Sequence, residues 1–268
     1  MTMDAWRLSV GTLTTVPIGA PIAVGSRVAA SAMVLAPVTA LLLAVPAGMV
    51  FWIALVSGTG SLVAAVLVVV TLRLGDRAFH LDGLADTADG LAASYDRERS
   101  LAVMRTGDTG PAGVVAVVMV LMAQIAGAAH LGTVGLAGGT EVAAGAGVAG
   151  SVVVSRAMLT LGCVRGVPAA RPDGLGAVVA GTVGRLRAAG LLLLVSVIFG
   201  GVLLAADPSA EMISSWSAPV ALGVAGAATA LVLRRCIQRF GGISGDVLGA
   251  IVEMALAASL LTLAALAG

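Results

Sequence analysis

The sequence predicts an all-α membrane protein, a polytopic helical bundle of about seven transmembrane helices. Of its 268 residues, 59% are apolar and only 11% are charged, whereas about a quarter of the residues in an average soluble domain are charged. Several uncharged runs are long enough to cross a bilayer core about 30 Å thick, which takes about 20 helical residues. These runs are continuously apolar rather than alternating, which favours helices over a closed β-barrel.

The composition argues against a soluble enzyme, a disordered chain and a nucleic-acid-binding protein. A formal net charge of +1 offers little attraction to a polyanion. Cys163 and Cys236 are too few for a disulfide framework, and we expect both to be reduced thiols. No compact apolar segment precedes Pro17, so the N-terminus does not resemble a cleaved signal peptide.

We expect one integral membrane domain over residues 1–268, with seven spans. The uncharged run from Val28 to Leu72 is long enough for two spans, with the polar stretch 57–60 as the hinge between them. The other five spans are expected near residues 111–130, 142–162, 188–206, 217–233 and 247–267. Cytoplasmic loops are expected near residues 73–111, 163–187 and 234–246.

The basic residues predict the orientation of the chain. All fifteen are arginines, and in the seven-span frame they all fall on one side of the membrane. Because positive charge accumulates in cytoplasmic loops, we expect the N-terminus inside and the C-terminus outside. One helix more or fewer in the middle of the chain would scatter the arginines over both faces.

The densest polar stretch is GDRAFHLDGLADTADGL, residues 75–91. Asp82, Asp86 and Asp89 are spaced i, i+4 and i+7, so on a helix they would share one stripe. Several carboxylates on one face suit Mg²⁺ or Mn²⁺, which bridge to substrate phosphates. The alternative is a solvated acidic loop in which Gly83 and Gly90 interrupt any helix.

A second acidic element lies at the start of the last expected helix. Asp246 stands at its mouth, where it could equally cap the helix, and Glu253 lies two turns deeper on the same face. Glu253, and Arg156 in the fourth span, are costly at membrane depth. Each therefore belongs either to a functional site or to an interhelical ion pair. His80 is a candidate general base, although a helix-end histidine bonded to a carbonyl fits equally well.

Carboxylates for a divalent metal, arginines for phosphate and a membrane scaffold together indicate metal-assisted phosphoryl transfer. The non-enzymatic alternative is a secondary transporter with Glu253 and Arg156 as coupling residues. Transport would favour charges near the bilayer midplane, whereas the acidic residues concentrate at one surface.

The stretch DGLADTADG, residues 82–90, resembles the cobalamin synthase family, also called adenosylcobinamide-GDP ribazoletransferase. Four more segments resemble family segments in the same order, so the resemblance spans nearly the whole chain: TLTTVPIG, MRTGDTGPAG, SRAMLTLGCVRGVPAARPDGLG and GGISGDVLGA. The resemblance implies that α-ribazole, or its 5′-phosphate, is joined to adenosylcobinamide-GDP with release of GMP and Mg²⁺ as cofactor. It places the chain in the cytoplasmic (inner) membrane of a prokaryote. Both a monomer and an oligomer are compatible with the resemblance.

Site residues follow from the same resemblance. The family's acidic motif, implied to bind metal and act in catalysis, is matched by Asp82, Asp86 and Asp89. Substrate binding is expected of Arg105, Arg156, Arg171 and Asp246. Thr106 and Asp108 depart from the family pattern, so their roles stay open. A rival class, the CDP-alcohol phosphotransferases, also has a motif that opens with Asp-Gly, but it carries an arginine where Asp86 stands.

Overall fold

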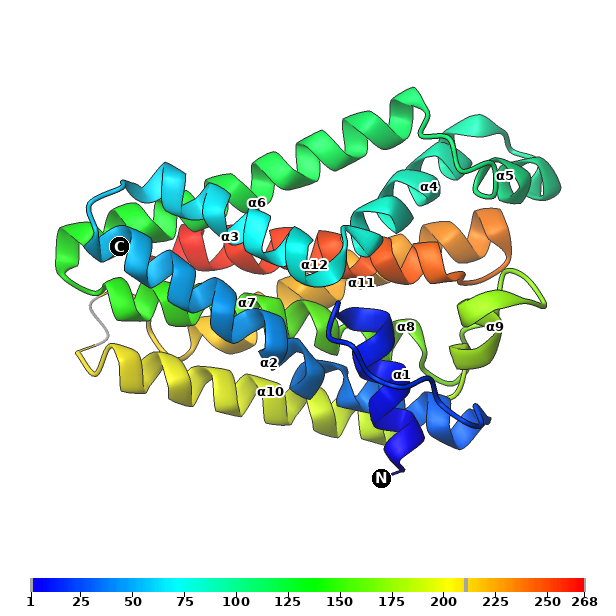
Figure 1. Ribbon diagram of the computed structural model, residues 1–268, viewed down its shortest axis with the longest axis horizontal. Coiled ribbons are helices and arrows are strands. Elements are labelled where there is room, and N and C mark those ends of the chain that lie inside the picture. The colour runs from blue at the N-terminus through cyan, green and yellow to red at the C-terminus, as the bar shows by residue number, and fades with distance from the viewer. Residues whose placement is uncertain (1, 210–211, 268) are drawn as a thin grey trace.

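The computed structural model describes residues 2–209 and 212–267, and within them it contains helices but no β-strand beyond two isolated bridges (Figure 1). The helices are α1 (Met3–Leu13), α2 (Ser26–Val56), α3 (Ser61–Asp76), α4 (Phe79–Ala93), α5 (Arg97–Val103), α6 (Pro111–Gly138), α7 (Glu141–Ala157), α8 (Leu159–Gly162), α9 (Gly174–Val179), α10 (Arg185–Ala206), α11 (Ser217–Phe240) and α12 (Gly245–Leu266). The prediction of an all-α bundle is confirmed.

Among the described residues, six helices are long and apolar enough to cross a membrane: α2, α6, α7 continued by α8, α10, α11 and α12. The expected seventh span corresponds to α3, which follows the hinge at residues 57–60. With 16 residues α3 is about 24 Å long, shorter than the bilayer core of about 30 Å. It stops at Asp76 because Arg77 and Ala78 take left-handed backbone angles, with φ of 58° and 55°.

Two of the expected loops are largely helical. Residues 73–111 hold α4 and α5, and α4 runs through Gly83 and Gly90 without interruption. The alternative of an irregular acidic loop is therefore wrong. Near residues 234–246, α11 continues to Phe240, so the connection to α12 is confined to residues 241–244. Residues 163–184 do form a connection with the short α9 as its helix, and α10 begins at Arg185.

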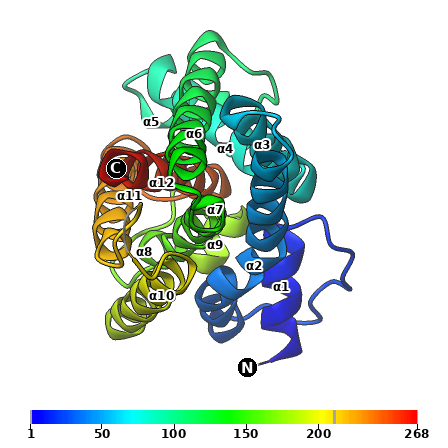
Figure 2. The ribbon, with the colours of Figure 1, turned by 90° about the vertical axis from the view of Figure 1, so that its left-hand side faces the viewer.

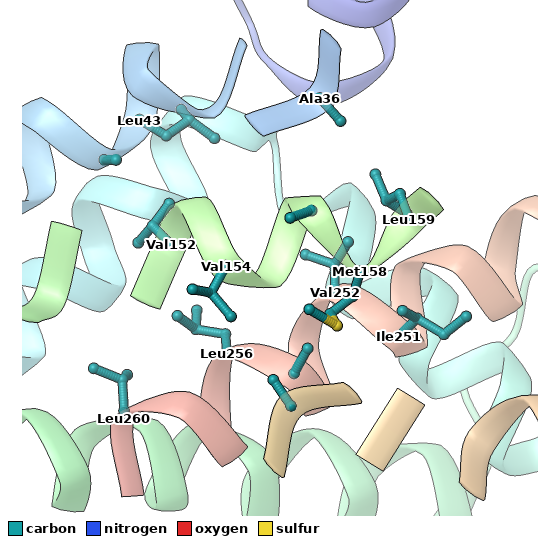
Figure 3. Close-up of a cluster of buried hydrophobic side chains, with 14 of the residues drawn as sticks. Ala36, Leu43, Val152, Val154, Met158, Leu159, Ile251, Val252, Leu256 and Leu260 are labelled. Atoms are coloured by element: carbon teal, nitrogen blue, oxygen red, sulfur yellow. The ribbon is translucent and has the colours of Figure 1, made fainter. Parts of the chain in front are cut away.

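The core of the bundle lies around α7 and α12, the most deeply buried of these helices, and α7 lies at the centre of Figure 2. Figure 3 shows apolar side chains of α12, among them Val252 and Leu256, packed against Val154 and Met158 at the end of α7. On the other side α7 lies very close to α2, since a Cβ on Gly48 would lie 2.8 Å from the carbonyl oxygen of Gly145. Small residues of this kind let membrane helices approach closely.

An equally close contact joins α4 to the first turns of α12. A Cβ on Gly83 would lie 2.8 Å from the carbonyl oxygen of Asp246, and one on Gly249 would lie 3.0 Å from the carbonyl oxygen of His80. The two backbones touch at both glycines. This contact sets α4 against the mouth of α12 and thereby brings their acidic residues together.

Candidate active site

The acidic side chains of α4 and α12 form one cluster. Asp82 is exposed, and Asp86 and Asp246 are half-buried. Burial, followed by the negative charges of Asp82, Asp246 and Asp89, raises the pKa of Asp86 to about 6, against the opposing effect of Arg171. The cluster thus carries more negative charge than its surroundings neutralise, which favours binding of a cation.

Arg171 is the cation nearest to this cluster. Its Nη2 donates to Oδ2 of Asp246 over 2.8 Å, and the hydroxyl of Ser244 donates to the same oxygen over 3.0 Å. Ser244, not Asp246, caps α12, because its hydroxyl accepts from the backbone N–H of Val247. The capping alternative for Asp246 is therefore wrong, and its carboxylate faces the cluster.

Asp89 is set apart from the other two aspartates of the stripe. Its side chain is buried and accepts hydrogen bonds from the backbone N–H groups of Gly110 and Gly113, over 2.7 and 2.8 Å. These amides open α6, so Asp89 neutralises the positive end of that helix from a neighbouring one. A Cβ on Gly113 would lie 2.3 Å from Oδ2 of Asp89. This packing explains two glycines of the MRTGDTGPAG segment, Gly110 and Gly113.

Two cavities flank α5 beside the cluster. One, of about 510 Å³, is lined by Arg97, Arg105 and Arg171 among others. The other, of about 500 Å³, is lined by Asp89, Thr106 and Asp108 among others. Two of the arginines expected to bind phosphate, Arg105 and Arg171, thus share one cavity next to the acidic residues.

Arg105 reaches the rim of its cavity. Its Nη2 lies 2.8 Å from both carboxylate oxygens of Asp173, in a pair that is mostly exposed. The contact ties the loop after α5 to the loop before α9. Because an exposed ion pair contributes little free energy, Arg105 can exchange Asp173 for another anion at low cost.

The structure does not bring His80 and Arg156 to the acidic cluster. Nδ1 of His80 lies 3.3 Å from Oδ2 of Asp76, and Nη2 of Arg156 lies 3.3 Å from the same oxygen. Both side chains are buried, Arg156 completely. His80 precedes Asp82 by two residues, which turns it to the other side of α4.

These residues belong to a buried polar network deep in the bundle. Nη1 of Arg73 donates to Oε1 of Glu253 over 2.7 Å, and Nε2 of Gln124 donates to Oε2 of Glu253 over 2.8 Å. Arg73 also lies 3.5 Å from Asp76. The ion-pair interpretation of Glu253 and Arg156 is confirmed, although their partners are Arg73 and Asp76 rather than each other.

The network also contains the closest set of metal-ligand atoms in the described part of the chain. Oxygen or nitrogen atoms of Asp76, His80 and Glu253 lie within 4.8 Å of one another. Arg73 and Arg156 already supply two positive charges to the two carboxylates, so a cation would add uncompensated charge there. Sequence reasoning missed Asp76 and Gln124, although Gln124 is a large polar residue in the middle of an apolar span.

The sequence model of the family described as cobalamin-5-phosphate synthase matches residues 5–264. The chain belongs to the cobalamin-5-phosphate synthase family. Among its curated relatives, the adenosylcobinamide-GDP ribazoletransferase of Nocardioides sp. is 43% identical and aligns over 98% of this chain and 99% of its own length. The protein of the same name from Frankia casuarinae is 37% identical, over 94% of this chain and 91% of its own.

Membership in the cobalamin-5-phosphate synthase family makes the chain a transferase and so decides against a transporter. No solved structure matches it. Its relatives extend to Bradyrhizobium diazoefficiens, whose adenosylcobinamide-GDP ribazoletransferase is 32% identical over 91% of this chain and 86% of its own length.

Proposed function

We propose that this chain joins α-ribazole, or its 5′-phosphate, to adenosylcobinamide-GDP and releases GMP. The names of the relatives supply the substrates. The observation that carries the proposal is the cluster of Asp82, Asp86 and Asp246 beside a cavity lined by Arg105 and Arg171. Carboxylates next to arginines can hold a divalent cation and a pyrophosphate side by side.

Asp82, Asp86 and Asp246 would hold Mg²⁺. Their oxygens are the ligands that this ion prefers, and burial together with the negative charges of Asp82, Asp246 and Asp89 raises the pKa of Asp86. When bound, Mg²⁺ supplies neutralisation of the charge on the pyrophosphate. Asp89 is instead assigned to holding α6 in place, because both of its oxygens already accept backbone hydrogen bonds.

The arginines bind and orient the substrate. Arg171 gains a second anionic partner when a phosphate enters the cavity that it lines, and Arg105 does so at the rim. Guanidinium groups bind phosphate oxygens in a bidentate manner, so lysine should be a poor replacement at either position. Arg156 has no exposed surface and stabilises the bundle rather than binding substrate.

The reaction is a single in-line displacement. A ribazole hydroxyl attacks the phosphorus joined to the cobinamide side and loses its proton to solvent water. The bond from that phosphorus to the oxygen of GMP breaks, and GMP leaves with that oxygen. The hydroxyl of Ser244 caps α12, and both cysteines are buried, so none of these is a nucleophile. His80 does not take the proton in this scheme, because it lies against Asp76 inside the bundle.

Purified full-length protein, given adenosylcobinamide-GDP, α-ribazole and limiting Mg²⁺, tests the proposal through the release of GMP. We expect Asn at position 82, 86 or 246 to lower turnover by about 100-fold, since charge stabilisation of this kind contributes that much. Asp4→Asn, an acid outside the cluster, serves as the control. Absence of GMP release from the wild-type chain would contradict the activity, and wild-type rates in all three variants would contradict the metal site.

A chiral thiophosphate substrate tests the displacement separately. One in-line step inverts the configuration at phosphorus. Net retention, or capture of a phosphorylated protein, would contradict the single displacement while leaving the activity itself in place.

A further inference from the structure

A large basic cavity lies away from the acidic cluster, where the N-terminal ends of α2 and α10 meet the connection that precedes α10. Its volume is about 1160 Å³, and four of its lining residues are Arg27, Arg165, Arg185 and Arg187. It shares no lining residue with the two cavities beside α5. The cavity is therefore a second anion-attracting place on the arginine-rich end of the bundle.

None of these four arginines is paired with a carboxylate in the described ranges 2–209 and 212–267. Within the same ranges, the one hydrogen bond made by their guanidinium groups runs from Nε of Arg185 to the carbonyl oxygen of Arg165, at 3.4 Å. The first backbone N–H groups of α2 and α10 point to the same end, and neither helix has a side-chain cap. All of this charge is positive, and the cavity is lined by no acidic residue.

An apolar groove continues from this cavity along the bundle. It has a volume of about 350 Å³ and lies between α2 and α10 over a floor formed by α7, the arrangement visible at the bottom of Figure 2. On α10 the cavity ends at Arg187 and the groove begins at Leu191, one helical turn later. It reaches Val202, about 22 Å beyond Arg187 at 1.5 Å per residue. Every residue that lines the groove is apolar.

We propose that this cavity and groove bind one anionic phospholipid, with its phosphate headgroup among the four arginines and an acyl chain along the groove. Charge complementarity selects an anion, and the apolar groove selects one that carries a hydrocarbon chain. Basic pockets between transmembrane helices bind anionic headgroups in this way. A soluble phosphate would use the arginines but would gain nothing from the groove.

The lipid also has a structural consequence. The groove separates α2 from α10, and both helices pack against α7. A bound acyl chain fills that space, and the single negative charge of the headgroup reduces the repulsion among the four arginines at the helix ends. We therefore expect the lipid to stabilise the position of α10 against the rest of the bundle.

Native mass spectrometry of the full-length protein in a neutral detergent tests the proposal. The probes are phosphatidylglycerol and phosphatidylcholine with identical acyl chains. We expect phosphatidylglycerol to be retained in preference, and Arg27→Ala with Arg187→Ala to weaken its retention about 30-fold, since each arginine beside an anionic headgroup contributes about 1 kcal/mol. Arg234→Ala with Arg235→Ala removes two exposed arginines outside the cavity and should change nothing.

The groove has a matched pair of variants on α10. Leu194 lines the groove and Leu193 does not, and both are exposed, by 54% and 67%. Leu194→Trp should fill the groove and lower retention, whereas Leu193→Trp should not. Equal retention of the two lipids, equal losses in the two arginine pairs, or equal behaviour of the two tryptophan variants would overturn the proposal. Displacement of the lipid by millimolar inorganic phosphate would assign the cavity to a soluble anion instead and would also overturn it.

Discussion

Replacing Asp76 with Asn removes one of the two negative charges of the buried network and leaves both arginines in place. The side chain of Asp76 accepts a hydrogen bond from the backbone N–H of Ala78 over 3.0 Å. It also lies 3.3 Å from Arg156, 3.3 Å from His80 and 3.5 Å from Arg73. An asparagine can still accept from Ala78, so the variant tests the charge rather than the shape.

The expected loss of stability is large because the charges lie deep in the bundle. Removing one partner of a buried ion pair costs about 3–5 kcal/mol, since the other charge is left without compensation. Arg105→Gln is the control, because Arg105 and Asp173 are 52% and 63% exposed and such a pair contributes about 0–1 kcal/mol. We therefore expect the two variants to differ by at least about 2 kcal/mol in the free energy of unfolding.

Denaturant titration of the detergent-solubilised protein measures this difference. Cys163 and Cys236 are both buried, so a thiol-reactive fluorophore reports unfolding without further labels. If Asp76→Asn loses no more stability than Arg105→Gln, the network does not stabilise the bundle as argued.

A double-mutant cycle on Arg73 and Glu253 provides an independent check. Met at either position alone leaves an unpaired buried charge, whereas Met at both restores neutrality. The double variant should therefore be more stable than the sum of the two single losses predicts, by about 1 kcal/mol or more. Strict additivity would contradict the pairing.

Further predictions concern the α4–α12 contact, the pH dependence and the topology. Gly83→Ala should lower stability by about 1–3 kcal/mol and lower turnover, because its Cβ would lie within 3 Å of the α12 backbone, whereas Gly190→Ala, with nothing within 4 Å, should not. A second test uses urea titrations between pH 4 and pH 7 with Mg²⁺ removed. As the pH rises, the free energy of unfolding of the wild type should fall relative to that of Asp86→Asn. The reason is that Asp86 has a pKa of about 6 in the folded state, above its unfolded value, so the folded chain keeps a proton that the unfolded chain releases. This effect on the free energy of unfolding is about 1 kcal/mol after solvent screening. Mg²⁺ should abolish the pH dependence of the difference between wild type and variant, and a pH-independent difference without Mg²⁺ would contradict the close approach of negative charges around Asp86. In cells whose protein lacks the native cysteines, a cysteine at Thr59 should react with an impermeant thiol reagent from outside and one at Ser94 should not; the reverse pattern would contradict the proposed orientation.

Several properties follow from the sequence because they depend on neighbours along the chain. Whether a segment crosses the bilayer depends on the length of its apolar run, and the run from Val28 to Leu72 predicts two helices and their hinge correctly. The stripe of Asp82 and Asp86 follows from helical periodicity. The same periodicity places His80 on the far side of α4, about 160° from Asp82 at 100° per residue. This placement could therefore be predicted from the sequence.

The composition of the candidate site depends on which helices are neighbours, and only the tertiary structure decides that. Asp246 joins Asp86 because Gly83 and Gly249 let two backbones touch. Asp89 is separated in role from Asp82 and Asp86 because its carboxylate accepts hydrogen bonds from the backbone N–H groups at the start of α6. Glu253 pairs with Arg73 because the packing of the bundle brings α12 and α3 together at this point. Which charged side chains pair with one another depends on the distances between them and on their burial. Both are fixed only when the helices pack.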